Sequence, residues 1–306
     1  MPLALILLPL VAQASALGQG IAGLNLPQLD RPATAPNPRR HKGVVFDIPA
    51  PPSRLKSCLD MVEGDPAEAA NSARVWLEEA AHPSPTAGPS ASGTPAASVA
   101  ATAQPQLCLG SALAAQGQWA KAEAAFTAGR DAAISDMVLR SQLAGMAGNA
   151  VLAQGLSEAH ARRALSLLDT AQGDALAAGK TTLAGGIALD RSRALVALNQ
   201  SAEAEKALDN ARTYLPDEPQ VWLLSATLSR RMGNLPNAQV QIETAARLAP
   251  QDAEIGVEAG VIAILSGHED AARKSWESVL KAAPNSPFAD RAAAYLAQLS
   301  PVSTTR

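Results

Sequence analysis

The feature that most constrains the fold of this chain is a repeat with a period of 34 residues in its second half. Pro216, Pro250 and Pro284 are separated by 34 residues, and three other columns keep the same spacing. These columns hold an asparagine or glycine (Asn199, Gly233, Gly267), an alanine (Ala204, Ala238, Ala272) and a bulky apolar residue (Leu208, Ile242, Trp276). Four columns that share one period indicate a repeated structural unit rather than a single globular core.

Each column has a structural reason in a unit made of two helices. Asparagine or glycine ends the first helix in the left-handed conformation that a tight turn needs. The alanine lets two helix backbones approach closely, and the bulky residue four positions later lies on the same face of the second helix. The proline ends the second helix. Because such a unit buries only part of its apolar surface alone, the units are expected to stack on one another.

The composition agrees with helices packed on helices. Hydrophobic residues make up 47% of the 306 residues, but aromatic residues only 3%, and alanine is the commonest apolar residue. Alanine is the best helix former, whereas sheets favour β-branched and aromatic side chains. The sequence therefore predicts an all-α fold.

The units resemble the tetratricopeptide repeat (TPR), a helix-turn-helix unit of 34 residues. The resemblance covers residues 54–300 and is clear in three units: the two that end at Pro250 and Pro284, and an earlier one that holds Gly117, Trp119 and Phe126. A degenerate unit is expected around residues 147–168, and a final single helix around residues 290–299. The resemblance implies a right-handed α-solenoid of stacked repeats, in which the first helices line a concave groove that binds a segment of a partner protein.

Carrying the family's groove over to matching positions gives a set of candidate partner-binding residues. They are Leu189, Arg193, Gln220, Leu223, Thr227, Arg230, Arg231, Glu254, Val257, Val261 and Ile264. The middle of this groove would be basic and its last unit largely apolar, which suits an acidic or amphipathic segment. The alternative is that the arginines form i,i+4 ion pairs with neighbouring acids, because such pairs are common on helices.

The start of the chain and one internal stretch differ in composition from the repeats. An apolar run from Leu3 to Val11, followed by Ala12-Gln13-Ala14, has the layout of a secretory signal peptide. This run is too short to span a bilayer, which takes about 20 apolar residues. We therefore expect an exported protein, in the periplasm or secreted. The predicted segments are a signal peptide (1–14), a Pro- and Ala-rich flexible linker (15–53), a repeat domain (54–300) with a disordered insert (82–104), and a tail (301–306).

The two cysteines, Cys58 and Cys108, fall in the predicted first helices of consecutive units. Stacked first helices lie side by side, and an exported protein can keep a disulfide. A bond between them would close a long loop and contribute about 4 kcal/mol in the chain-entropy model. The alternative is two separate buried thiols that lie one helical turn out of register.

No feature of the sequence indicates catalysis or a cofactor. The four histidines, His41, His82, His160 and His268, are scattered, and no two have the helical spacing that holds a metal jointly. No nucleophile-elbow, phosphate-loop or metalloprotease sequence is present. The net charge of -3, with signs mixed along the chain, lacks the concentrated basic face of a nucleic-acid binder. No later stretch is long and apolar enough to cross a membrane.

We therefore predict that the protein is not an enzyme and binds no metal, nucleic acid or small-molecule cofactor. Its expected role is that of a scaffold or adaptor for a protein or peptide partner in cell-envelope assembly, secretion or pilus biogenesis. The alternatives are a periplasmic holding chaperone, which would bind many unfolded clients weakly, and a regulatory subunit of an envelope enzyme.

Overall fold

The structure, a computed structural model, describes residues 53–82 and 99–299. These residues form thirteen α-helices and contain no β-strand, as the composition predicts. The predicted signal peptide (1–14), almost all of the predicted linker (15–53), most of the predicted insert (82–104) and the tail (301–306) lie outside the described residues. The chain divides into two compact units, which are described separately.

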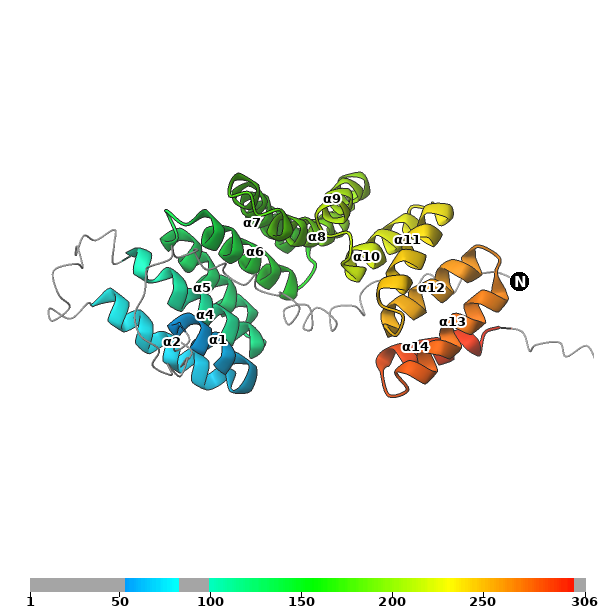
Figure 1. The fold of residues 1–306 in the computed structure, drawn as a ribbon, viewed down its shortest axis with the longest axis horizontal. Helices are drawn as coiled ribbons and strands as arrows, with labels where there is room; N and C mark the ends of the chain where they lie inside the picture. The colour runs from blue at the N-terminus through cyan, green and yellow to red at the C-terminus, as the bar shows by residue number, and fades with distance from the viewer. Residues whose placement is uncertain (1–52, 83–98, 300–306) are drawn as a thin grey trace, which may run out of the picture. The chain divides into compact units, whose positions relative to one another are not determined.

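The first unit contains two pairs of helices (Figure 1). They are α1 (Arg54–Gly64), α2 (Pro66–Ala81), α4 (Ala103–Ala115) and α5 (Trp119–Ala132). Asp65 separates α1 from α2, and its side chain accepts hydrogen bonds from the backbone N–H groups of Ala67 and Glu68, both at 3.0 Å. Helix α4 begins inside the predicted insert, because Ala103 and Pro105 are already buried in the core.

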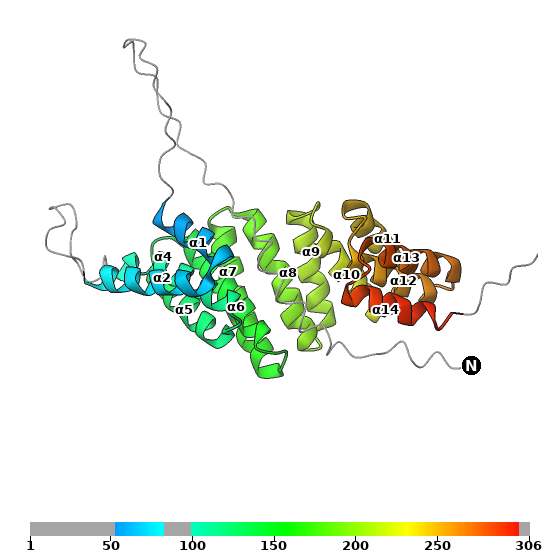
Figure 2. The same cartoon turned by 90° about the horizontal axis from the view of Figure 1, so that it is seen from below.

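The second unit contains nine helices in successive antiparallel pairs, ending with a single helix (Figures 1 and 2). They are α6 (Met137–Ala153, whose last residue belongs to the first unit), α7 (Glu158–Ala177), α8 (Thr181–Ala197), α9 (Ser201–Tyr214), α10 (Pro219–Arg231), α11 (Leu235–Leu248), α12 (Ala253–Leu265), α13 (Glu269–Ala282) and α14 (Pro287–Leu296). The even-numbered helices are the first helices of their repeats, and the odd-numbered ones are the second helices.

The turns within the repeats confirm the prediction made from the asparagine and glycine column. Asn199, Gly233 and Gly267 have φ angles of 59°, 79° and 82°, in the left-handed region. After each of them, the next backbone N–H returns to a carbonyl of the preceding first helix, as in the 2.8 Å bond from Asn234 to Ser229. This is the hydrogen-bond pattern of a Schellman C-cap, which satisfies the last carbonyls of the helix.

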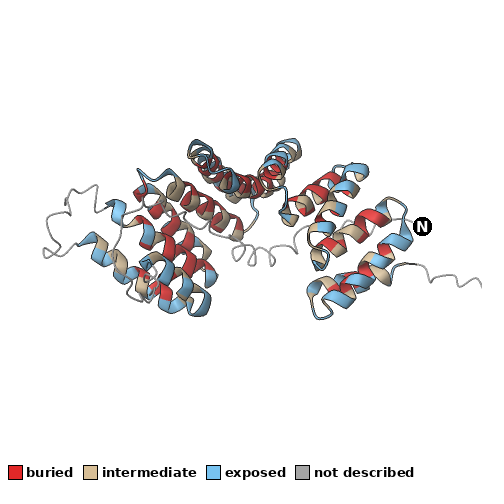
Figure 3. Ribbon diagram, in the orientation of Figure 1, coloured by how far each residue is buried: buried red, intermediate tan, exposed pale blue. Residues whose placement is uncertain are grey.

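The alanine and bulky columns form the core between paired helices. Ala204, Ala238 and Ala272 are fully buried, and Leu208, Ile242 and Trp276 are each only 2% exposed. In the last full repeat, a Cβ atom added to Gly260 would overlap the indole of Trp276, so α12 can approach α13 only because residue 260 is glycine. Figure 3 shows buried residues along the sides where paired helices meet.

The proline column also acts as predicted. Helices α9, α11 and α13 each end two residues before Pro216, Pro250 and Pro284 respectively. The residue between helix and proline leaves the helical region, with φ angles of -134°, -136° and -141°. A proline ring disfavours helical backbone in the residue that precedes it, which fixes the end of the second helix.

Two boundaries differ from the sequence prediction. The degenerate repeat, predicted around residues 147–168, is a longer pair, since α6 has 17 residues and α7 has 20. The final helix begins at Pro287 rather than near Asp290, because the Ser286 side chain caps it by accepting the backbone N–H of Ala289 at 3.2 Å.

Candidate partner-binding face

The predicted groove residues lie on the first helices α8, α10 and α12, but they do not all lie on an accessible surface. Leu189, Leu223, Val257 and Val261 are between 2% and 8% exposed and pack into the core. The prediction that these four residues line an open groove is therefore corrected: they support the face from beneath. The apolar character that they would have given to the groove belongs instead to the interior.

The remaining candidates are at least partly accessible. Arg193, Gln220, Thr227, Arg230, Glu254 and Ile264 are half-buried, and Arg231 is exposed. The 34-residue register places Phe288, Arg291 and Tyr295 of α14 at the slots that follow Glu254, Val257 and Val261. We call the accessible side chains of α8, α10, α12 and α14 at these slots, together with the charged partners that they bind, the first-helix face.

Arg193 on this face is held by an acid that the sequence reading did not single out. Its guanidinium donates to Asp190 Oδ1 at 2.5 Å, and Asn149 of α6 donates to the other carboxylate oxygen at 2.6 Å. Burial raises the pKa of Asp190, and the charge of Arg193 and the two hydrogen bonds oppose that rise. The cluster joins α6 to α8 and uses both oxygens of the carboxylate.

Arg230 is held in the same way by the next repeat. Its Nε atom donates to Glu258 Oε1 at 2.6 Å, and its Nη2 atom donates to Oε2 at 3.4 Å. The Arg230 side chain is 18% exposed and that of Glu258 is 14% exposed. The pair therefore joins α10 to α12 in a largely desolvated setting.

These two pairs correct the prediction of a basic groove centre. Of the three predicted arginines, Arg193 and Arg230 are neutralised by acids, and Arg231 is exposed. The alternative interpretation, pairing with neighbouring acids, describes the face better, although neither pair has the i,i+4 spacing. One pair spans three residues within α8, and the other connects two helices.

Glu254 differs from the other acids of the face. Its half-buried carboxylate forms no hydrogen bond or ion pair with any residue that the structure describes. Burial raises its pKa, and the charges of Asp252 and Glu258 raise it further, whereas Arg291 and Arg193 lower it. Charges from α8 and α14 thus both act on a carboxylate of α12.

The comparisons with known proteins concern structure alone, since no family model and no curated protein matches the sequence. Similar solved structures include BtubC from P. vanneervenii, with a TM-score of 0.55, 12% identity, and coverage of 82% of this chain and 95% of that one. Pseudomonas aeruginosa pilF has a TM-score of 0.53 and 16% identity, and the match covers 79% of this chain and 95% of pilF. TTC0263, a TPR protein of Thermus thermophilus, has a TM-score of 0.51 and 21% identity, with 64% and 99% coverage.

The fold is that of TPR proteins. At these identities the likeness shows the fold alone. TPR proteins generally bind other proteins, and their scaffold is typically non-catalytic. Among the residues of the TPR helices described here, no three His, Cys, Asp or Glu side chains gather as they would around a metal ion. None of the described helices combines the length and the apolar character needed to cross a membrane.

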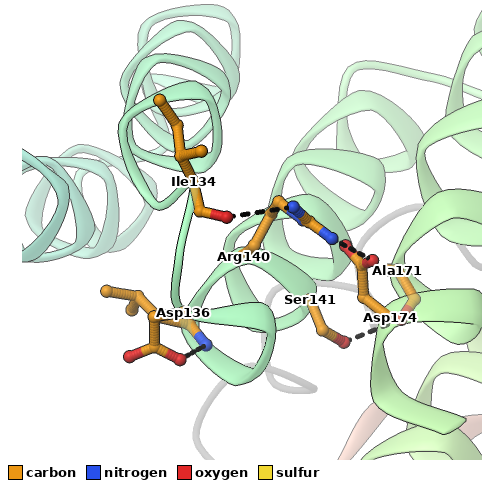
Figure 4. Close-up of polar contacts among 7 residues, drawn as sticks. Ile134, Asp136, Arg140, Ser141, Ala171 and Asp174 are labelled. Carbon is orange, nitrogen blue, oxygen red and sulfur yellow. Dashed lines mark hydrogen bonds and ion pairs between the residues drawn. The ribbon is translucent and has the colours of Figure 1, made fainter. Parts of the chain in front are cut away.

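A second polar cluster, in the degenerate TPR unit, has a structural explanation (Figure 4). Arg140 of α6 binds both carboxylate oxygens of Asp174 of α7, at 2.6 and 2.7 Å, and donates to the Ile134 carbonyl at 3.3 Å. Ser141 donates to the Ala171 carbonyl at 2.7 Å. The hydrogen bond to Asp174 raises the pKa of Arg140. Because the two charges satisfy each other, the cluster clamps α6 to α7 and leaves no free group for a ligand.

In the first of the two compact units, Cys58 of α1 and Cys108 of α4 are joined by a disulfide, with their Cα atoms 6.1 Å apart. Both cysteines are buried, at 3% and 0% exposure. The bond therefore links the first helices of two consecutive repeats.

The sequence reading missed Asn149, Asp190, Glu258 and Arg291. A signal for two of them was present, because Asp190 and Glu258 share one slot of the 34-residue register with Leu224 between them. Asp190 stands three residues before Arg193, and Glu258 stands 28 residues after Arg230. The register thus puts both acids on the side of the first helix that faces its neighbour.

Proposed function

We propose that this chain is a non-catalytic scaffold or adaptor that binds a segment of a partner protein on the first-helix face of its second unit. One observation carries the proposal. Second helices cover the other side of each first helix, whereas on this face Gln220, Thr227, Glu254 and Ile264 stay half-buried and in part solvated. A preformed surface of this kind orders a partner segment with little rearrangement of its own.

The proposal extends to the compartment. A disulfide between buried cysteines is typical of proteins that work outside the reducing cytoplasm, and the structure pairs Cys58 with Cys108. We propose an exported protein, in the periplasm or secreted, acting in envelope assembly, secretion or pilus biogenesis. The likeness to pilF is one of fold and selects none of these pathways. Thiol labelling of the protein recovered from intact cells, with and without reductant, tests the compartment: free thiols before reduction would contradict export.

Site-specific photocrosslinking in the native cell tests the binding face. A photoreactive amino acid replaces Thr227 or Ile264 on the face, or Val240 or Lys274 on the exposed sides of second helices as matched controls. The proposal expects one discrete crosslinked partner from positions 227 and 264 and none from the controls. Many weak products from all four positions would indicate a holding chaperone instead. Crosslinks confined to positions 240 and 274 would place binding on the opposite side and refute the proposal.

A further inference from the structure

We infer that the partner segment carries a lysine or arginine side chain next to apolar residues, and that Glu254 binds this cation. The inference rests on the proposed function, because it assigns the chemistry of the segment that the first-helix face receives. The sequence suggested an acidic or amphipathic segment, and this inference reverses the expected sign of its charge.

The first step is that the other half-buried charges on this face are already committed. Arg193 is bound to Asp190, which also accepts from Asn149. Arg230 is bound to both carboxylate oxygens of Glu258. An incoming acidic group would have to break one of these pairs and leave a desolvated acid unmatched, which is unfavourable. Neither Arg193 nor Arg230 is therefore available to bind an acidic group of a partner.

The second step is that Glu254 is an acid of the same face without a bound cation. Within the described residues its carboxylate accepts no hydrogen bond, whereas the carboxylates of Asp190 and Glu258 are paired. The groups whose charges act on it are Asp252, Glu258, Arg193 and Arg291. Two of these are acids and two are bases, and Arg193 is already paired with Asp190. The two arginines offset the effect of burial only in part, and the pKa of Glu254 stays raised, so a cation brought by a partner would stabilise the carboxylate.

The third step is that an aromatic side chain occupies the register slot next to Glu254, on the helix α14 that contacts α12. The 34-residue register places Phe288 of α14 at the slot that follows Glu254, and Arg291, whose charge acts on Glu254, lies 4.9 Å over the Phe288 ring. Phe288 is half-buried. Lysine and arginine have long apolar stems, which pack on such surfaces while the charged end meets an acid. The surroundings of Glu254 thus fit a cationic side chain with apolar neighbours.

Peptide selection on the full chain tests this chemistry. Random twelve-residue peptides are selected on immobilised wild-type protein, on Glu254→Gln, and on Glu277→Gln, which changes an exposed acid on the second helix α13. Wild type and Glu277→Gln are expected to enrich peptides with a lysine or arginine beside apolar residues, and Glu254→Gln is expected to lose that enrichment. A selected peptide should bind Glu254→Gln about tenfold more weakly, since a charged hydrogen bond is lost. Added salt should reduce the difference in peptide affinity between wild type and Glu254→Gln, because salt screens the charge interaction.

The outcomes separate this inference from the proposed function. If wild type selects peptides that bind the first-helix face but carry acidic or no charged residues, the cation is refuted and the binding function stands. Equal binding of basic peptides to wild type and Glu254→Gln also refutes the role of Glu254. If no peptide binds, or if bound peptides crosslink only to second helices, the proposed function fails and the inference fails with it.

Discussion

Reduction of the Cys58–Cys108 disulfide is expected to release α1 and α2 from the first unit while the second unit stays folded. The reason lies in how little these two helices bury. The only buried residue of α1 is Cys58 itself, and the buried residues of α2 are Ala69, Ala70 and Ala73. Each buried methyl contributes about 0.8 kcal/mol, so the three alanines together contribute about 2 kcal/mol. Half-buried apolar side chains that pack in the same place, such as Met61 and Val62, add to this burial energy.

The disulfide contributes more than these alanines to the free energy that holds α1 and α2 in the first unit. The two cysteines are separated by 50 residues in sequence. Closing a loop of that size removes chain entropy from the opened state and contributes about 4 kcal/mol in the chain-entropy model. Because each 1.4 kcal/mol is a factor of ten, reduction should raise the population of the locally opened state roughly 1000-fold. The expected change is local, since units of a repeat array depend mainly on their immediate neighbours.

Hydrogen exchange followed by mass spectrometry measures this opening directly. Peptides from residues 54–81 should lose protection when reductant is added, and peptides from residues 219–282 should not. A Cys58→Ala/Cys108→Ala double variant should show the same fast exchange without reductant and should not respond to reductant. Unchanged protection of residues 54–81 after complete reduction would refute the reasoning, because the alanine contacts alone would then hold the pair. Simultaneous loss of protection in both regions would refute the claim that the effect is local.

Three further predictions concern the second unit. Gly260→Leu should lower the free energy of unfolding by about 2 kcal/mol in urea titrations, because its side chain would overlap the Trp276 indole, and an added Trp276→Leu change should restore part of the loss. Glu258→Gln should lower the free energy of unfolding by about 2 kcal/mol, since it weakens the charged hydrogen bonds of the largely buried Arg230. Thermal unfolding tests this, and an unchanged melting temperature would show that the pair contributes nothing to stability. Glu254→Gln should instead stabilise the chain at neutral pH, because burial raises the pKa of Glu254 above its unfolded value and so disfavours its ionised form in the folded state. That gain should shrink as the pH falls through the folded pKa, where wild type also becomes neutral, and urea titrations that give the same gain at pH 7 and pH 4 would contradict this cause.

The helical repeat could be predicted from the sequence because each column is enforced by local backbone chemistry. Gly233 and Gly267 take a positive φ that few other residues adopt, and Pro250 and Pro284 cannot continue a helix. These constraints act within a few residues of the chain and so appear directly as spacing. Where the glycine and proline signals fade, in α6 and α7, the lengths of the helices could not be predicted.

The binding face was harder to predict because exposure depends on neighbouring helices. Leu223 and Arg231 both occupy groove slots of α10 in the family pattern, yet one is 2% exposed and the other is exposed. Slot spacing gives the direction of a side chain around its own helix, whereas its burial depends on how closely the next first helix approaches. The pairing of Arg230 with Glu258 likewise depends on a contact between repeats, which no single helix encodes.

The arrangement of charges along the first-helix face explains why one acid can carry specificity. Asp190 and Arg193 of α8 neutralise each other, and the same two slots in α10 hold the uncharged residues Leu224 and Thr227. In α12, the first of these slots holds Glu258, which is neutralised by Arg230. Among the half-buried charges, a partner segment lying across these helices would therefore meet paired groups until it reaches Glu254, whereas Arg231 and Arg291 are exposed. Since the energetic penalty of desolvating that carboxylate is already present in the free protein, a cation at this point would gain binding energy that an uncharged or acidic residue there would not.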